Sequence, residues 1–153
     1  MTVHDMHLEI STLINASPQD VYGLVSDLGR MGEWSTENIG GEWTHGTPGE
    51  VGSRFLGTNR IKTFEWSVPV EVTVADPGEC FEFVAAPDDG PFVRWTFRLA
   101  PTSVGTELTE IWDVMALPPS LAKLDTDGLA ARKAAVQGTI GATLEGIKAS
   151  AEQ

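Results

Sequence analysis

An acidic residue within an otherwise apolar stretch is the clearest candidate for chemistry in this sequence. The segment Thr106–Met115 alternates with a period of two, which is typical of a strand whose successive side chains point to opposite faces. Glu110 shares one face with Leu108, Trp112 and Val114. A carboxylate among hydrophobic residues needs a partner, a raised pKa or a solvated cavity, and perturbed carboxyl groups in clefts are candidates for acid–base work. We therefore predict a functional role for Glu110. The alternatives are a bulge that turns it outward and a structural pairing with an arginine.

Asn59 and Arg60 are the other polar candidates. Asn59 alternates with Phe55 and Gly57 on one predicted strand face, so its amide could orient a ligand carbonyl or hydroxyl. A turn position before Arg60 is the alternative. Arg60 itself either pairs with Glu110 or a ligand acid, or lies on a solvated rim.

The usual catalytic and metal-binding patterns do not occur. His4, His7 and His45 are scattered without ligand spacing, and Cys80 is the single cysteine, which excludes an intrachain disulfide and a thiolate cluster. The sequence contains no Gly-x-Ser-x-Gly elbow, and Gly40-Gly41 precedes a strand rather than a helix. We expect neither a metal nor another cofactor.

Length and charge narrow the class of protein. The 153 residues fit a single domain spanning 1–153, and the formal net charge is −12. That charge disfavours nucleic acid and anionic membranes as partners. The sequence has no apolar run of about 20 residues and no signal-peptide pattern at its start. We therefore predict a cytoplasmic protein without membrane insertion, either a monomer or a homodimer.

Two helices frame the predicted fold. Ser17, Pro18 and Asp20 are typical of a helix start, and the apolar spacing extends that helix from Pro18 to about Leu28, with a further turn over 30–34. The second helix, over 128–153, carries one apolar stripe and a polar face with basic and acidic groups. The stripe comprises Val136, Ile140, Thr143, Leu144, Ile147 and Ala151. The polar face comprises Arg132, Lys133, Lys148 and Glu152.

Seven strands are predicted, separated by short turns rich in proline, glycine and aspartate. Their ranges are 4–14, 41–45, 53–59, 63–75, 80–86, 92–100 and 106–115. Pro69 predicts a bulge or an edge within the fourth. Short connections imply an antiparallel meander, so the fold class is α+β: a curved seven-stranded antiparallel sheet wrapped around the long C-terminal helix, in the order β-α-α-β6-α. The segment before the last helix is expected to be a loop or a short helical turn.

Three glycines interrupt the C-terminal helix. Gly138, Gly141 and Gly146 each cost about 1 kcal/mol relative to alanine. The simpler interpretation is tight packing against the sheet. The alternative is that small residues leave room for a cavity beneath the helix.

Several segments together resemble the polyketide cyclase/dehydrase family of the START-like (SRPBCC, helix-grip) superfamily. They are 14–22, Asp27-Leu28, 33–35, 52–60, Trp66, 74–77, 81–83, 95–99 and 105–110. The resemblance implies a deep, mainly apolar cavity between the curved sheet and the C-terminal helix, used for lipids, polyketides or hormones. Cyclase members of the family use a cavity arginine. The stretch 64–74, where that arginine is expected, contains none, which weakens the cyclase interpretation.

Aromatic and aliphatic side chains on the inward faces are the predicted ligand contacts. They are Trp34, Phe55, Trp66, Phe83, Trp95, Phe97, Trp112, Ile140 and Leu144. The first functional hypothesis is a carrier or sensor of a small hydrophobic molecule. The second is a cyclase or dehydrase in which Glu110 is the acid–base group while Asn59 and Arg60 polarise a carbonyl. The third is a partner-binding domain with a filled core.

Overall fold

A seven-stranded antiparallel sheet and a long helix dominate the computed structural model, which describes residues 2–153. The sheet order is β1-β7-β6-β5-β4-β3-β2. The strands are β1 (His7–Ile14), β2 (Asn38–His45), β3 (Arg54–Ile61), β4 (Phe64–Asp76), β5 (Cys80–Ala85), β6 (Val93–Thr102) and β7 (Gly105–Val114). The helices are η1 (Val3–Asp5), α1 (Pro18–Val25), η2 (Leu28–Glu33), α2 (Pro119–Ala122) and α3 (Thr126–Ala151). The predicted architecture is thus confirmed, and the segment before α3 contains a short helix.

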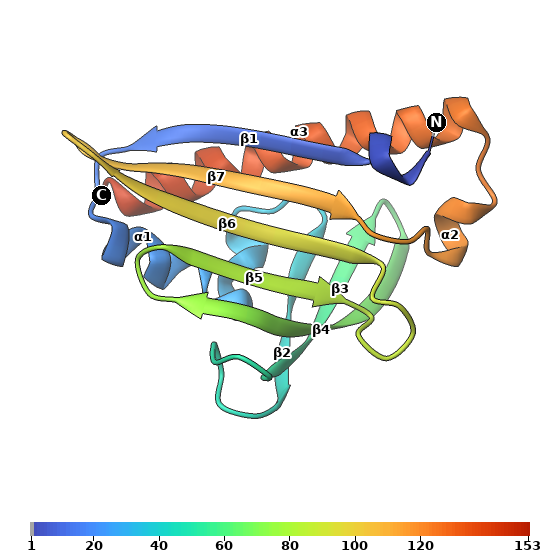
Figure 1. Cartoon of the computed structure of the whole chain (residues 1–153), viewed down its shortest axis with the longest axis horizontal. Coiled ribbons are helices and arrows are strands. Elements are labelled where there is room, and N and C mark those ends of the chain that lie inside the picture. Colours follow the sequence, from blue (N-terminus) through green and yellow to red (C-terminus); the bar gives the residue numbers. More distant parts are fainter. Residues whose placement is uncertain (1) are drawn as a thin grey trace.

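The long helix runs beside β1 and β7 along the length of the sheet, and α1 lies near the β4–β5 turn at one end of the sheet (Figure 1). Its apolar stripe is buried as predicted: Val136, Ile140, Leu144 and Ile147 are at most 2% exposed. Burial of that stripe against a sheet is the main source of stability for such a helix.

Two lysines on the polar face of α3 bind the chain near the β1 edge. Lys133 Nζ donates to the carbonyl of Asp5 at 2.6 Å, and Lys148 Nζ to that of Leu13 at 2.8 Å. Edge strands present unpaired carbonyl and amide groups. Lys148 satisfies one such acceptor on β1, and Lys133 binds the turn η1 that precedes the strand. The polar face of α3 therefore holds the helix to the sheet edge.

The N-terminal segment shows two further differences. The strand predicted from residue 4 begins at His7, because Val3–Asp5 form a 3-10 turn in which Thr2 N donates to Asp5 Oδ2. The helix predicted to reach Leu28 ends at Val25, and the chain continues through η2. The start of α1 is as predicted: the backbone N–H of Asp20 donates to Ser17 Oγ at 3.1 Å.

Pro69 lies in the interior strand β4, where the pairing of β4 with β5 ends. It pairs with Leu56 of β3, whereas the pairing of β4 with β5 begins one residue later at Val70. The Pro69 carbonyl still accepts from the backbone N–H of Ala86 at 2.8 Å, so Pro69 marks the end of the β4–β5 pairing. The irregular register of β4 lies at Val72/Val74.

The strand β2 begins three residues before its predicted start and is bulged at both ends. At Gly41, with φ of +153°, an added Cβ would lie 2.2 Å from the carbonyl oxygen of Leu56. Only glycine fits such an approach of one backbone to the next.

The three glycines of α3 have different surroundings. A Cβ on Gly146 would come within 2.2 Å of Trp34 Cβ, whereas a Cβ on Gly138 or Gly141 would meet nothing within 4 Å. Close packing thus explains Gly146 alone, and its partner is the end of η2 rather than the sheet.

Candidate functional site

A large cavity lies between the sheet and α3. Its volume is about 740 Å³, within the range of small-molecule sites in proteins. Residues of β3 to β7 supply the wall on the sheet side, and Val136, Thr139 and Thr143 supply it on the α3 side. Because β1 and β7 hold the helix at one side of the curved sheet, the middle strands are left uncovered and the space beneath them stays open.

The cavity opens toward one end of the molecule. Ile61 and Phe64 from the β3–β4 hairpin, Asp89 from the β5–β6 loop and Ser120 from α2 line it and are exposed. These three segments lie at the same end of the sheet, opposite the β6–β7 turn (Figure 1). Phe64 is 67% exposed and stacks on Trp66 with ring centroids 5.4 Å apart, so the entrance itself is apolar.

Glu110 lines the interior of this cavity. It is 4% exposed, and across the sheet it faces Ile10 of β1 and Phe97 of β6. Its Oε1 atom has no hydrogen-bond partner within residues 2–153. Burial in these apolar surroundings raises the pKa of Glu110 to about 8. The carboxyl group is therefore protonated at neutral pH and can donate a hydrogen bond or a proton to a molecule in the cavity.

An ion pair between two lining residues is the second polar feature of the cavity. Arg132 of α3 binds Glu37 through two hydrogen bonds of 3.0 and 3.2 Å, and Thr139 lies 3.5 Å from the same carboxylate. This ion pair is largely buried, with side-chain exposures of 28% for Arg132 and 16% for Glu37. It links α3 to the segment between η2 and β2.

Arg132 is predicted on the polar face of α3, opposite the apolar stripe, but in the structure it lines the cavity. Arg132 stands four residues before Val136 and eight before Ile140. It therefore lies on the buried stripe itself. That spacing could have identified it as a cavity residue.

Eight of the predicted site residues line the cavity together. They are Phe55, Asn59, Trp66, Phe83, Trp95, Phe97, Glu110 and Trp112. The register explains this grouping, because Phe83 pairs with Trp95, and Trp95 with Trp112. Inward residues of neighbouring strands therefore form continuous rows across the sheet.

The other four predicted site residues lie outside the lining. Arg60 is exposed and pairs with Glu65 at 2.9 Å. Ile140 and Leu144 belong to the packed core. Trp34 is buried against Gly146, with the Arg30 guanidinium 5.2 Å from its ring centroid. Its indole Nε1 is buried without a partner within the described residues.

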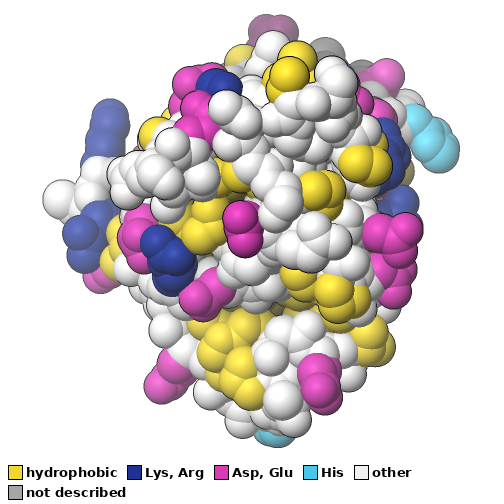
Figure 2. Space-filling model, turned by 90° about the vertical axis from the view of Figure 1, so that its left-hand side faces the viewer, with side chains coloured by type: hydrophobic (Ala, Val, Ile, Leu, Met, Phe, Trp, Pro, Cys, Tyr) yellow, Lys and Arg dark blue, Asp and Glu magenta, His cyan; other side chains and the backbone are white. Residues whose placement is uncertain are grey.

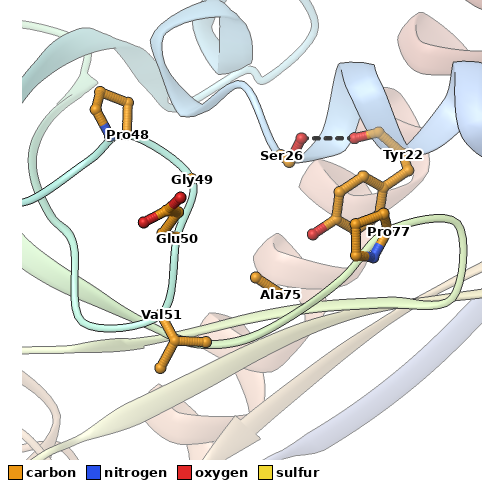
Figure 3. A pocket seen from close by; sticks show the side chains of 8 residues that line it. All are labelled: Tyr22, Ser26, Pro48, Gly49, Glu50, Val51, Ala75 and Pro77. Carbon is orange, nitrogen blue, oxygen red and sulfur yellow. Dashed lines mark hydrogen bonds between the residues drawn. The ribbon is translucent and has the colours of Figure 1, made fainter.

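A smaller hollow lies between α1, the β2–β3 loop and the β4–β5 turn. Figure 3 shows Tyr22 and Pro77 on one side and Glu50 with Val51 on the other. Burial and the nearby Asp76 raise the pKa of Tyr22. Among the described residues, the ionisable side chains that line this hollow are Tyr22 and Glu50. In Figure 2 acidic side chains are spread over the face seen from the left of Figure 1, with apolar side chains between them.

None of the helices in the described part of the chain is long and apolar enough to cross a membrane. Within residues 2–153, no three histidine, cysteine, aspartate or glutamate side chains are close enough together to hold a metal ion.

Three solved protein structures are similar to this chain over nearly its whole length. The solution structure of the Polyketide_cyc-like protein Cgl2372 from Corynebacterium glutamicum is similar over 94% of this chain and 89% of its own, with 30% identity and a TM-score of 0.66. The di-domain ARO/CYC StfQ from the steffimycin biosynthetic pathway matches 96% of this chain with half of its own length, at 15% identity and a TM-score of 0.77. The major latex-like protein 151 of Panax ginseng matches 96% of this chain and 97% of its own, at 14% identity and a TM-score of 0.70.

The last two comparisons concern the fold alone, and they confirm the helix-grip arrangement. No curated protein sequence matches the chain. The model of the family described as polyketide cyclase / dehydrase and lipid transport matches residues 5–152. The chain therefore belongs to the polyketide cyclase/dehydrase and lipid transport family.

Proposed function

We propose that the protein binds a small, mainly apolar molecule in the cavity between its sheet and α3, as a carrier or sensor. The observation that carries this proposal is the cavity itself: about 740 Å³ lined mostly by apolar and aromatic side chains. Stable proteins fill their interiors to a density that leaves few voids larger than a water molecule. An opening of this size, lined by aromatic groups, favours a ligand over a merely structural role. It also argues against the filled core of a domain that only binds partner proteins.

The family supports the same class of ligand, since its description includes lipid transport. A mixed apolar and aromatic wall binds such molecules mainly by removing their surface from water. Asn59 and Thr143 also line the cavity, and these polar groups would fix the orientation of the bound molecule.

A test of the proposal uses the neutral dye Nile red and a variant that fills the cavity. Ala85 lines the cavity from β5, so Ala85→Phe places a ring in the space. Ala100→Phe is the matched control, because Ala100 is exposed on β6. We expect the wild-type protein and the control to bind Nile red equally, and Ala85→Phe to bind at least about tenfold more weakly. Equal binding by all three proteins, with unchanged circular dichroism, would reject the proposed site.

An enzyme of the cyclase or dehydrase type is the second candidate, and Glu110 favours it. A buried carboxyl group whose pKa is about 8 holds a transferable proton at neutral pH, as a general acid requires. Asn59 lines the same cavity and could polarise a carbonyl. Arg60 lies outside it, which removes one of the predicted groups from this mechanism.

Replacing Glu110 by glutamine separates the two candidates. General acid–base catalysis contributes about 10²- to 10⁴-fold to rate, so an enzyme that uses Glu110 would lose turnover by that factor and keep its ligand affinity. The substrate to test first is a ligand released from the purified protein and identified by native mass spectrometry. Turnover unchanged in Glu110→Gln would reject the catalytic role.

A further inference from the structure

We infer that the molecule bound in the cavity carries a basic nitrogen, so that the ligand class is a small aromatic or apolar amine. This inference rests on the proposed function and specifies the chemistry of its ligand. It depends on three features: the charges that line the cavity, the unpaired oxygen of Glu110 and the rings that surround it.

The ionisable groups of the lining are mostly acidic. In the described part of the chain they are Glu37, Asp89, Glu110 and Arg132. The guanidinium of Arg132 already makes two hydrogen bonds to Glu37. The cavity therefore offers no free cation to an anionic ligand, and it retains two acids without a basic partner. A carboxylate ligand would lose its hydration without gaining a cationic partner, which is strongly unfavourable.

The unpaired oxygen lies in the interior rather than at the rim. Glu110 is 4% exposed, and its Oε1 has no hydrogen-bond partner in residues 2–153. Buried polar atoms without partners are rare in native proteins, and each such atom costs free energy. Glu110 lines the cavity, and its carboxyl group can turn about its last side-chain torsion, which is soft. That turn would present the unpaired oxygen to the cavity, where an N–H donor on a ligand would supply the missing partner without breaking any hydrogen bond that the structure contains.

The proton balance of this pairing is simple. When a neutral amine enters, the proton moves from the carboxyl group of Glu110 to the ligand nitrogen, and an ammonium–carboxylate pair results. When the ammonium form enters, Glu110 releases its proton to solvent and the same pair forms. Mutual attraction and the hydrogen bond then offset the cost of burying both charges.

Aromatic rings next to Glu110 favour a cation in the same place. Trp112 lies two residues after Glu110, on the same face of β7. On the neighbouring strand β6, Phe97 pairs with Glu110 and Trp95 pairs with Trp112. All three rings line the cavity. Cations are attracted to ring faces, most strongly to those of tryptophan, and the attraction increases when the cation is desolvated.

The test compares three ligands of one shape and different charge at pH 7 by isothermal titration calorimetry. They are 2-naphthylmethylamine, 2-naphthalenemethanol and 2-naphthoic acid. We expect the amine to bind the wild-type protein at least about tenfold more tightly than the alcohol, and the acid more weakly than either. Titrations in two buffers of different ionisation enthalpy should show release of nearly one proton per amine bound and none for the alcohol.

Two variants distinguish an amine preference caused by Glu110 in the cavity from one caused by the negative charge of the surface. Glu110→Gln should lose the preference for the amine and keep its affinity for the alcohol within about threefold. Glu107→Gln is the control, because Glu107 lies on the same strand and is exposed. It removes the same formal charge and should keep the preference.

The outcomes also separate this inference from the proposed function. Equal affinity for the amine and the alcohol, or a preference that survives in Glu110→Gln, would overturn the amine assignment while the cavity remains a binding site. If Nile red binds and none of the three naphthalenes does, the amine assignment is also overturned while the cavity remains a binding site. If neither Nile red nor any of the three binds the folded protein, both proposals fail.

Discussion

Glu110 lies directly opposite Phe97 across the β6–β7 pair, and its Oε1 has no hydrogen-bond partner in the described chain. The same placement gives the carboxyl group its high pKa and its exposure to the cavity. The role of Glu110 can therefore be tested in two ways: by its effect on the stability of the fold and by its effect on the ligand preference proposed above.

The stability of the protein should fall as the pH rises from 5 to 8 because of Glu110. The pKa of this group is about 8 in the folded protein and 4.5 as its ordinary value. Between these values the unfolded chain releases a proton that the folded chain retains, so the unfolded state is favoured increasingly with pH. Between pH 5 and pH 8, Glu110 lowers the free energy of unfolding by about 3 kcal/mol.

Urea unfolding of the wild-type protein and Glu110→Gln at pH 5, 6, 7 and 8 measures this effect. The variant lacks the titrating group, so the difference between the two free energies of unfolding should change by about 3 kcal/mol across the series. Taking the difference cancels the other titrating groups. A constant difference would show that Glu110 does not have a raised pKa.

Alanine substitutions at two glycines of α3 should have opposite effects. In Gly146→Ala the new Cβ would lie 2.2 Å from Trp34 Cβ, and relieving that clash should cost about 2 kcal/mol of the free energy of unfolding. Gly138→Ala meets nothing within 4 Å and should stabilise the helix by about 1 kcal/mol. Thermal and urea unfolding of both variants would check the signs. Stabilisation by Gly146→Ala would contradict the close contact with Trp34.

The ion pair between Glu37 and Arg132 should contribute more than an exposed pair. Its side chains are 16% and 28% exposed, whereas those of Glu33 and Arg30 are 55% and 40% exposed. A double-mutant cycle with Glu37→Gln and Arg132→Gln should give a coupling energy of about 1–2 kcal/mol. The cycle at Arg30 and Glu33 should give a smaller coupling energy, because water and salt screen an exposed pair. Equal coupling energies would mean that the buried pair does not hold α3 to the η2–β2 segment.

Phe64 should control the exchange of ligand at the entrance. It lines the cavity, is 67% exposed and stacks on Trp66. Phe64→Ala removes little buried surface, so stability should change by less than about 0.5 kcal/mol. The dissociation rate of Nile red in stopped-flow measurements should rise several-fold. Val104→Ala is the control, because Val104 is similarly exposed in the β6–β7 turn at the other end of the sheet. The same rate in both variants would place the entrance elsewhere.

The sequence determined the elements of this fold and the faces of its strands. Period-two alternation placed Glu110 on the same face as Trp112, and strand pairing preserves such a face. The spacing of three and four predicted the buried stripe of α3. The start of α1 followed from Ser17 and Pro18, because capping depends on residues that are adjacent in the chain.

Tertiary structure decided which groups meet. The partner of Arg132 is 95 positions away, at Glu37, and no local pattern specifies such a pair. Trp34 was predicted for the cavity, but packing on Gly146 places it outside. The volume of the cavity depends on where α3 rests on the curved sheet. That position is set by many weak contacts and by hydrogen bonds such as that of Lys148 to Leu13, which act between segments far apart in the chain.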